Sequence, residues 1–322
     1  MLGESMGYQG LRSSAPREDA PAAITDVGCE REINEDRYAV LESNAGRMWV
    51  VCDGMGGVQG GELAAQLALD AMRRGLESRT FNTPEEALFG AIEEANRRIV
   101  LRKQNPQFGG MGTTVVAAIE YAGEVVIGSA GDSRAYLVRA GEIQQLTTDH
   151  TYVQDLVERG MISAQEALTH PQAHVLTRCL GAEPRLDMDT TRFWIWDTAA
   201  GEVNDRLVLC SDGLYSHVSD EEIASIISNN SPQDACVKLV EAAKKEGGYD
   251  NITVAVLPIH GQLREEAPPE PQRAARVAAV SQGSQAKAAR VPWSRQLMIM
   301  FFLAIIGAVV TTLLVLWQAS AG

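Results

Sequence analysis

The sequence predicts an α+β domain in which the strands pair antiparallel. Residues 113–120, 124–128 and 135–139 form three β-rich runs, and short turns that contain glycine separate them. Runs joined by such turns are typical of antiparallel hairpins, so we do not expect a parallel doubly wound sheet. Two helices precede them, over 62–79 and over 83–103, and we expect both to cover one face of the sheet.

The other elements follow from local signals along the chain. Residues 1–22 are small and polar without an apolar run, which excludes a secretory signal and predicts a disordered tail. Thr83, Pro84 and Glu86 match a capping box at the start of the second helix. Further elements expected are helices that begin at Ser219 and Ser231 and strands over 38–42, 48–52, 206–210 and 251–257.

Composition and charge limit the classes of function. The chain has 322 residues, of which 45% are hydrophobic, so a sizeable core is available. A net charge of -14 argues against a nucleic-acid partner, because contact with phosphate backbones needs a basic surface. Five cysteines without a C-x-x-C pair fit reduced thiols in a cytosolic domain better than disulfides or a zinc site.

The stretch Asp53-Gly54-Met55-Gly56-Gly57 follows the apolar run 48–52 and is the first candidate site. Glycines let backbone carbonyl and amide groups approach a small charged ligand closely. A carboxylate beside an exposed carbonyl suits a hard cation such as Mg²⁺ or Mn²⁺. An ordinary Asp-Gly turn explains this stretch, taken alone, equally well.

Aspartate recurs at the ends of the predicted strands. If these ends meet at one edge of a sheet or sandwich, the carboxylates converge and repel one another, and cations relieve the repulsion. Two hard cations held by oxygen ligands polarise a bridging water and clamp a phosphate during in-line attack. The residues placed in this way are Asp36, Asp53, Asp132, Asp212 and Asp250.

Arg31 and a pair of histidines are further candidates for the site, and Arg31 has two interpretations. The planar guanidinium of Arg31 suits two phosphate oxygens at once. A surface ion pair within the charged run 30–32 is equally expected. His170 and His174 are four residues apart, as metal ligands on a helix can be, but no third ligand accompanies them in the sequence. We therefore expect them to have a structural or flap role.

Together, the motifs resemble those of bacterial type 2C metal-dependent Ser/Thr protein phosphatases, the PPM family. The resemblance covers about residues 24–258, with the motifs in the family's order. Each motif is weak alone, whereas the set is highly specific. The motifs are Arg31-Glu32-Ile33-Asn34-Glu35-Asp36, Asp53-Gly54-Met55-Gly56-Gly57, Gly112-Thr113-Thr114, Gly131-Asp132-Ser133-Arg134-Ala135-Tyr136, Ser211-Asp212-Gly213 and Asp250-Asn251.

The resemblance implies a four-layer α-β-β-α sandwich of two antiparallel sheets flanked by helices, with a dinuclear Mn²⁺ or Mg²⁺ site between the edges of the sheets. Asp53 would bridge both metals, and the Gly54 carbonyl would bind one of them. Asp212 and Asp250 would hold the other metal, and Asp132 would serve a weaker third one. Residues 151–190 would form a variable flap beside the cleft.

Three further residues have implied roles in the reaction. Glu35 and Asp36 would orient metal-bound waters, and Asp36 is also counted with the metal site. Arg31 would hold the substrate phosphate. Met55 is a departure, since many relatives have there a His that is a candidate general acid. Met cannot donate a proton, so protonation of the leaving group would fall to metal-bound water.

The composition changes after the catalytic domain, which is predicted over residues 23–259. Residues 260–292 are rich in Ala, Pro, Gln, Glu and Arg, which indicates a flexible linker. Residues 297–317 are uncharged and mostly apolar, and as a helix they would be about 31 Å long, enough to cross a bilayer. Basic residues in the linker predict a single-pass protein of the inner membrane with its catalytic domain in the cytosol. A buried core helix is the weaker alternative.

Two classes of function follow from the sequence. The first is the hydrolysis of phosphoserine and phosphothreonine in proteins, opposite to Ser/Thr kinases at the membrane. The second is a non-catalytic, membrane-tethered module that binds phosphoproteins with the same fold, and the presence of every metal-site carboxylate argues against it. The anchor would either raise the effective concentration of substrates at the lipid bilayer or only fix the location of the protein.

Overall fold

All strand pairs of the computed structural model are antiparallel across the residues it describes, 19–56, 60–198 and 204–288. The five-stranded sheet consists, in spatial order, of β1 (Ala22–Asp26), β12 (Ile252–Pro258), β11 (Arg206–Cys210), β8 (Arg134–Arg139) and β9 (Glu142–Gln145). The six-stranded sheet consists of β13 (Gln262–Arg264), β10 (Asp189–Trp196), β7 (Glu124–Ala130), β6 (Val115–Tyr121), β3 (Gly46–Cys52) and β2 (Arg37–Ser43). A short pair joins β4 (Gly54–Met55) to β5 (Gly112–Thr113).

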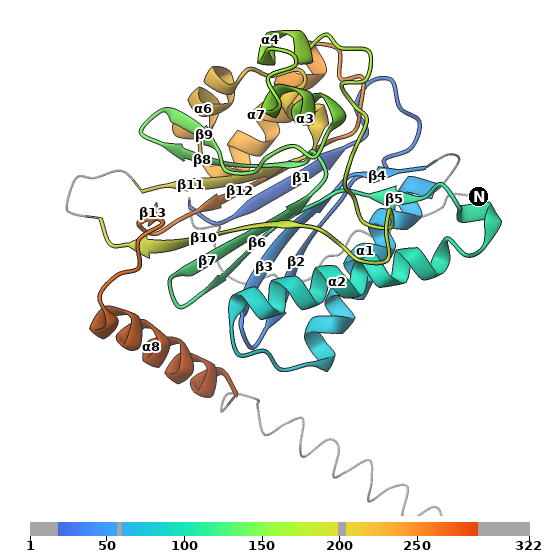
Figure 1. Ribbon diagram of the computed structural model, residues 1–322. Helices are drawn as coiled ribbons and strands as arrows, with labels where there is room; N and C mark the ends of the chain where they lie inside the picture. Colours follow the sequence, from blue (N-terminus) through green and yellow to red (C-terminus); the bar gives the residue numbers. More distant parts are fainter. Residues whose placement is uncertain (1–18, 57–59, 199–203, 289–322) are drawn as a thin grey trace, which may run out of the picture. The chain divides into compact units, whose positions relative to one another are not determined.

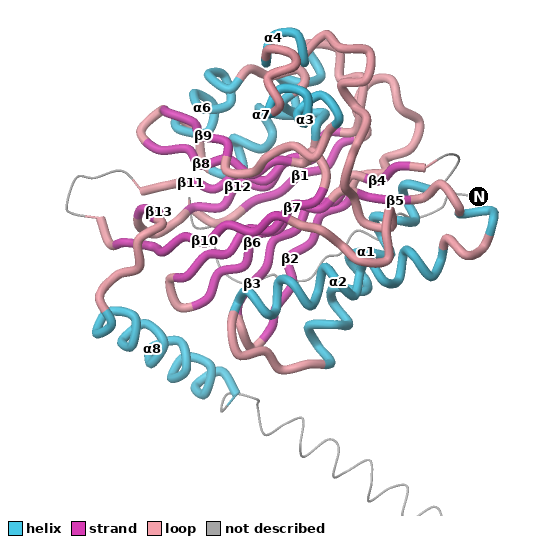
Figure 2. The backbone as a smooth tube through the Cα atoms, viewed as in Figure 1, coloured by secondary structure: helices cyan, strands magenta, loops and turns pink. Residues whose placement is uncertain are grey.

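Helices cover the outer face of each sheet (Figure 1). Helices α1 (Gly60–Ser78) and α2 (Pro84–Arg102) pack on the six-stranded sheet, and α6 (Asp220–Ser228) and α7 (Pro232–Lys245) pack on the five-stranded sheet. Figure 2 shows the two layers of strands between these helices. The shorter helical segments are η1 (Pro106–Phe108), α3 (Tyr152–Glu158), α4 (Ala164–Ala167) and α5 (Asp212–Tyr215).

Three buried apolar clusters hold these layers together. One lies between α1, α2 and the six-stranded sheet, and another lies between α7, α6 and the five-stranded sheet. The third lies between the two sheets and includes Val51, Val116, Leu209 and Ala255. Residues alternate between the two faces of a strand, so a strand buried on both faces contributes to two clusters. The predicted α+β fold of antiparallel sheets flanked by helices is confirmed.

The helix starts follow the local signals, with one change in partner. The Thr83 hydroxyl accepts a hydrogen bond from the Glu86 amide at 3.1 Å, which caps α2 as predicted. The Glu86 carboxylate, however, accepts from the backbone N–H of Asn82 at 2.9 Å, so the reciprocal half of the capping box falls one residue earlier. Ser219 and Ser231 cap α6 and α7, as expected.

The segment predicted as a flexible linker, residues 260–292, contains two described elements. Strand β13 pairs with β10, because Leu263 is buried between the sheets and its backbone N–H donates to the Asp205 carboxylate at 2.6 Å. Helix α8 (Glu270–Ala288) belongs to a second unit, Pro269–Gly322, which is distinct from the unit Met1–Pro268.

Strand β10 was not predicted. Its buried residues alternate, with Phe193 and Ile195 buried, and this alternation is a strand signal in the sequence.

Within the described residues, no helix is both long and apolar enough to cross a bilayer. The predicted transmembrane span, residues 297–317, lies outside them, and so do residues 1–18 of the predicted N-terminal tail.

Candidate active site

The register of the strands brings the five predicted aspartates to one end of the sandwich. In the six-stranded sheet the first residue of β2 pairs with the last residue of β3, so Asp36 and Asp53 lie next to each other. In the five-stranded sheet the last residue of β11 pairs with the first residue of β8 and the third residue of β12. The turns that carry Asp132, Asp212 and Asp250 therefore share that sheet's edge.

A cavity of about 440 Å³ lies at this end. Asp36 is not among its lining residues and is 1% exposed, yet its charge acts on that of Asp53. The other predicted site residues all line the cavity, namely Arg31, Glu35, Asp53, Gly54, Asp132, Asp212 and Asp250. The structure thus gathers the predicted set in one place, with Asp36 buried beside it.

Two threonines fix the backbone of Asp53: Thr113 at the end of β5, and Thr114 directly before β6. The Asp53 N–H donates to the Thr114 hydroxyl at 2.9 Å, and the Thr114 N–H donates back to the Asp53 carbonyl at 2.8 Å. The Thr113 hydroxyl donates to the same carbonyl at 2.8 Å. These bonds use the peptide groups of Asp53 and leave its carboxylate free to face the cavity.

Glycine at position 54 is required by the close approach of helix α1. A Cβ atom on Gly54 would lie 2.1 Å from the carbonyl oxygen of Gly61, and one on Gly61 would lie 2.6 Å from a carboxylate oxygen of Glu35. Real Cβ contacts are not that short, so a larger residue at either position would push the helix away from the site. The last glycine of the loop, Gly57, lies outside the described residues.

Asn251 ties the segment that carries Glu35 and Asp36 to the start of β12. Its side-chain oxygen accepts from the Glu35 N–H at 2.7 Å, and its side-chain NH₂ donates to the carbonyls of Val27 at 2.9 Å and Ile33 at 3.1 Å. Asn251 is 4% exposed. The sequence analysis assigned it no role, although an amide directly before a mostly apolar strand was a usable signal, because buried polar groups need partners.

Arg31 pairs with Asp250, at a distance of 2.7 Å between Nη2 and Oδ2. The other oxygen of Asp250 accepts from the Asn251 N–H at 2.8 Å. The ion pair is therefore formed across the cavity and not within the run 30–32. The Arg31 side chain is 48% exposed, so the guanidinium is accessible from the cleft.

Burial and mutual repulsion raise the pKa of the clustered carboxyls. Burial raises the pKa of Asp36 to about 7, with a further contribution from Asp212, while hydrogen bonds from Ser211 and Thr253 act in the opposite direction. Burial and the charges of Asp36 and Asp212 raise the pKa of Asp53 well above its ordinary value. Burial, followed by the charges of Asp212 and Asp149, raises the pKa of Asp132 to about 8.

The donor set fits hard divalent cations. Oδ1 of Asp36 and Oδ1 of Asp212 are buried without a hydrogen-bond partner, and a cation is the partner that buried carboxylate oxygens otherwise lack. Within the described parts of the chain, no three His, Cys, Asp or Glu side chains are gathered closely enough to hold one ion. Both oxygens of Asp250 are engaged, by Arg31 and by the Asn251 N–H, so a cation that binds Asp250 would replace one of these partners.

The flap segment contributes two histidines with different environments. His174 lines the cavity, with Nδ1 at 3.9 Å from Oδ2 of Asp212, whereas His170 packs against Tyr152. The two rings therefore face different partners, and the structural or flap role of these histidines stays a prediction. His150, which the sequence reading did not single out, is buried and accepts from the Gly131 N–H at 3.1 Å.

The chain is similar in sequence and in structure to known proteins. Residues 30–245 match the family Protein phosphatase 2C. The chain is 37% identical over 240 residues to a serine/threonine phosphatase stp of Listeria welshimeri, covering 72% of this chain and 93% of that protein. The crystal structure of the Mycobacterium tuberculosis phosphatase PstP/Ppp is similar with a TM-score of 0.64 and 35% identity, over 73% of this chain and 96% of that one. Another structure, the PstP catalytic domain in complex with two manganese ions, is similar with a TM-score of 0.61 and 34% identity, over 73% and 96%.

Proposed function

Because the chain belongs to the protein phosphatase 2C family of Ser/Thr protein phosphatases, we propose that it hydrolyses phosphoserine and phosphothreonine in proteins at a dinuclear Mn²⁺ or Mg²⁺ site. The observation that carries the proposal is the meeting of Asp53, Asp132, Asp212 and Asp250 around one cavity. Four carboxylates around one cavity repel one another and serve no packing purpose there. A cation pair gives them one, and the PstP structure holds two manganese ions.

We assign Asp53, the Gly54 carbonyl, Asp212 and Asp250 to the two metals, and Asp132 to a weaker third. When bound, such cations lower the pKa of water and neutralise charge on a phosphate. The unpartnered oxygen of Asp212 and the position of Asp53 on the cavity wall support this assignment.

The remaining residues position the substrate and the attacking water. Arg31 exchanges its partner Asp250 for two oxygens of the phosphate, since its guanidinium is exposed to the cavity. Glu35 lines the cavity as an acceptor for a water proton, while Asp36 acts from the buried side through its unpartnered oxygen. Hydrolysis then forms a bond from the water oxygen to phosphorus and breaks the bond to the serine or threonine oxygen. Met55 lines the cavity but cannot supply the proton that this leaving group takes up.

The test replaces one oxygen of the central carboxylate. Asp53→Asn keeps the size of the side chain, and we expect it to abolish Mn²⁺-dependent release of phosphate from a phosphoserine peptide. Asp70→Asn, on the exposed face of α1, is the matched control and should keep full activity. Full activity of Asp53→Asn, or activity in excess chelator, would contradict the proposal. A non-catalytic module would bind the peptide without turnover at any Mn²⁺ or Mg²⁺ concentration.

We also propose that residues 297–317 anchor the enzyme in the inner membrane with the catalytic domain in the cytosol, near Ser/Thr kinases and their substrates. The support is the uncharged apolar composition of this segment, with Trp293 four residues before it and Trp317 as its last residue, and the basic residues that precede it. Removal of residues 289–322 should move the protein from the membrane fraction to the supernatant of lysed cells. An unchanged distribution would show that the segment is not an anchor.

A further inference from the structure

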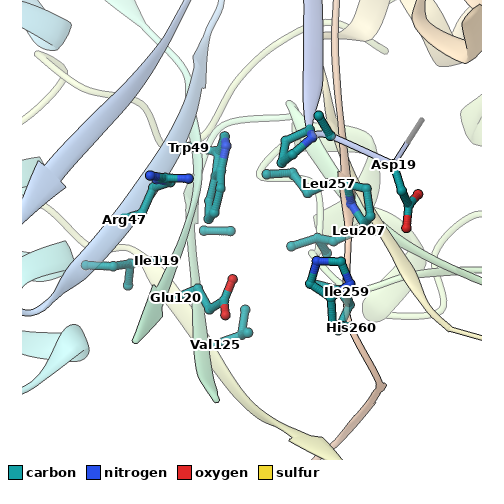
Figure 3. Close-up of a pocket in the computed structure, with 14 residues that line it drawn as sticks. Asp19, Arg47, Trp49, Ile119, Glu120, Val125, Leu207, Leu257, Ile259 and His260 are labelled. Carbon is teal, nitrogen blue, oxygen red and sulfur yellow. The ribbon is translucent and has the colours of Figure 1, made fainter. Parts of the chain in front are cut away.

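A second cavity, of about 370 Å³, lies between the two sheets. Trp49 of the six-stranded sheet lines one side, and Leu207, Leu257 and Ile259 line the other (Figure 3). Ala118, which pairs with Trp49 in the six-stranded sheet, also lines the cavity. These residues lie towards the strand ends opposite to the carboxylates: Arg47, two residues before Trp49, pairs with Glu120, and Arg206 pairs with Pro258. The cavity is therefore separate from the candidate active site.

The chemistry of the walls selects an uncharged ligand. The walls are mostly aromatic and aliphatic, and the charged groups at the rim have partners within the protein. Arg47 is paired with Glu42 at 2.6 Å, and Asp19 lies 3.9 Å from Arg206. Glu120 also has an interaction within the protein. A charged ligand would have to displace these pairs, whereas an apolar one gains from contact with the walls.

The volume is within the range of small-molecule sites, which begins at about 300 Å³. The small side chain of Ala118 leaves this space, since Ala118 is buried in the cluster between the sheets and pairs with Trp49 of the neighbouring strand. Exposed residues such as Arg47 and His260 also line the cavity, so a ligand can enter it from solvent.

We propose that this cavity binds an uncharged apolar small molecule, and that its occupancy changes the affinity of the active site for divalent cations. The second part rests on the proposed function. Three strands join the two places: β3 runs from Trp49 towards Asp53, β11 runs from Leu207 towards Asp212, and β12 begins after Asp250 and ends at the cavity.

The coupling between the cavity and the metal site follows from the origin of the carboxylates, because they come from strand ends of both sheets. Asp53 directly follows β3 of the six-stranded sheet, while Asp212 and Asp250 lie just outside the ends of β11 and β12 of the five-stranded sheet. A ligand wedged between the sheets at one end alters their spacing, and the rigid strands transmit this change to the distance across the metal site. A ligand shifts such an equilibrium only through unequal affinity for the two spacings, which makes the coupling reciprocal and measurable.

The experiment uses N-phenyl-1-naphthylamine, an uncharged aromatic probe whose fluorescence rises in apolar surroundings. The full chain is held in lipid nanodiscs, and wild type is compared with Ala118→Phe at equal lipid, so that the partition of probe into lipid cancels. We expect saturable binding of one probe per chain in the wild type and at least tenfold weaker binding in Ala118→Phe. Leu101→Phe, which adds the same ring on the exposed side of α2, is the control and should bind like the wild type.

Ala118→Met, with a more flexible side chain, serves as a second filling variant in case Ala118→Phe fails to fold. Equal probe binding by the wild type and a folded filling variant would overturn the site. Mn²⁺ binding is measured in the same samples from the EPR signal of the free ion. We expect saturating probe to change the Mn²⁺ dissociation constant of the wild type about fivefold or more, and not that of a filling variant.

The experiment distinguishes a failure of the coupling from a failure of the proposed function. Probe binding with an unchanged Mn²⁺ affinity would overturn the coupling. A wild-type chain that binds no Mn²⁺ at all would overturn the proposed function, and the probe titration would still decide whether the cavity is a ligand site.

Discussion

The substitution Asp36→Asn is expected to stabilise the metal-free protein while it impairs the enzyme. Asp36 is buried, one of its oxygens accepts from the Ser211 hydroxyl at 2.7 Å, and the other has no partner. Asn has nearly the same shape and can still accept the hydrogen bond from Ser211 through its oxygen. It removes the charge that burial and the neighbouring aspartates make unfavourable.

The magnitude follows from proton linkage. The pKa of Asp36 is raised from 3.8 to about 7 in the folded protein, which corresponds to about 4 kcal/mol of lost stability once both states are ionised. Because the folded state binds the proton more tightly, this loss is absent below the unfolded pKa and grows as the pH rises from about 4 to about 7. Relaxation around the site reduces the gain that Asn recovers to roughly 1–3 kcal/mol at pH 8.5, and to about a third of that at pH 5.

Urea unfolding in EDTA, at pH 5 and pH 8.5, measures both values. Asp70→Asn on the exposed face of α1 is the control, and it should change the free energy of unfolding by less than about 0.5 kcal/mol at either pH. Mn²⁺ should stabilise the wild type more than Asp36→Asn, because the carboxylate is then compensated. If Asp36→Asn destabilised the metal-free protein at pH 8.5, the claim that this charge is buried without compensation would be wrong.

Three other outcomes are expected. Arg31→Ala should raise the KM for a phosphopeptide about tenfold or more. The free energy of unfolding should change by less than about 1 kcal/mol, because the Arg31–Asp250 pair is partly exposed. An unchanged KM in steady-state kinetics would contradict the phosphate role. Asn251→Ala removes the partner of three backbone groups in part-buried hydrogen bonds, so thermal and urea unfolding should show a loss of about 2–4 kcal/mol. A neutral result would mean that water replaces the amide. His150→Ala removes the acceptor of the Gly131 N–H and should cost about 1–3 kcal/mol and raise the Mn²⁺ concentration needed for activity, which a metal titration measures.

The helix and strand limits were largely predictable because they depend on neighbouring residues. Ser231 followed by Pro232 marks the start of α7 by capping chemistry alone, and the structure begins the helix at Pro232. The strands β6, β7 and β8 were recognised from their β-branched residues and glycine turns. Strand β13 could not be found in this way, since three residues in a polar, proline-containing segment become a strand only through pairing with β10.

The aspartates of the site were predictable as a set, whereas their partners were not. Each aspartate follows or precedes a predicted strand, which is a local signal. The resemblance to the PPM family implied that all of them meet at one metal site. The contacts of Arg31 with Asp250 and of Glu35 with Asn251 join residues 219 and 216 positions apart. No local pattern encodes such a pair, so it appears only when antiparallel register brings β1 and β12 side by side.

The position of the site at the ends of the strands also explains how the fold tolerates it. The three apolar clusters lie within the layers, and they hold both sheets without help from the carboxylates. Repulsion among Asp36, Asp53 and Asp212 therefore acts on turns and strand ends, which can move, and not on the core. A carboxylate placed two residues further into β3, at Val51, would face the cluster between the sheets and could reach neither water nor a cation. The repulsion that lowers stability is thus confined to the strand ends around the cavity, where divalent ions can compensate it.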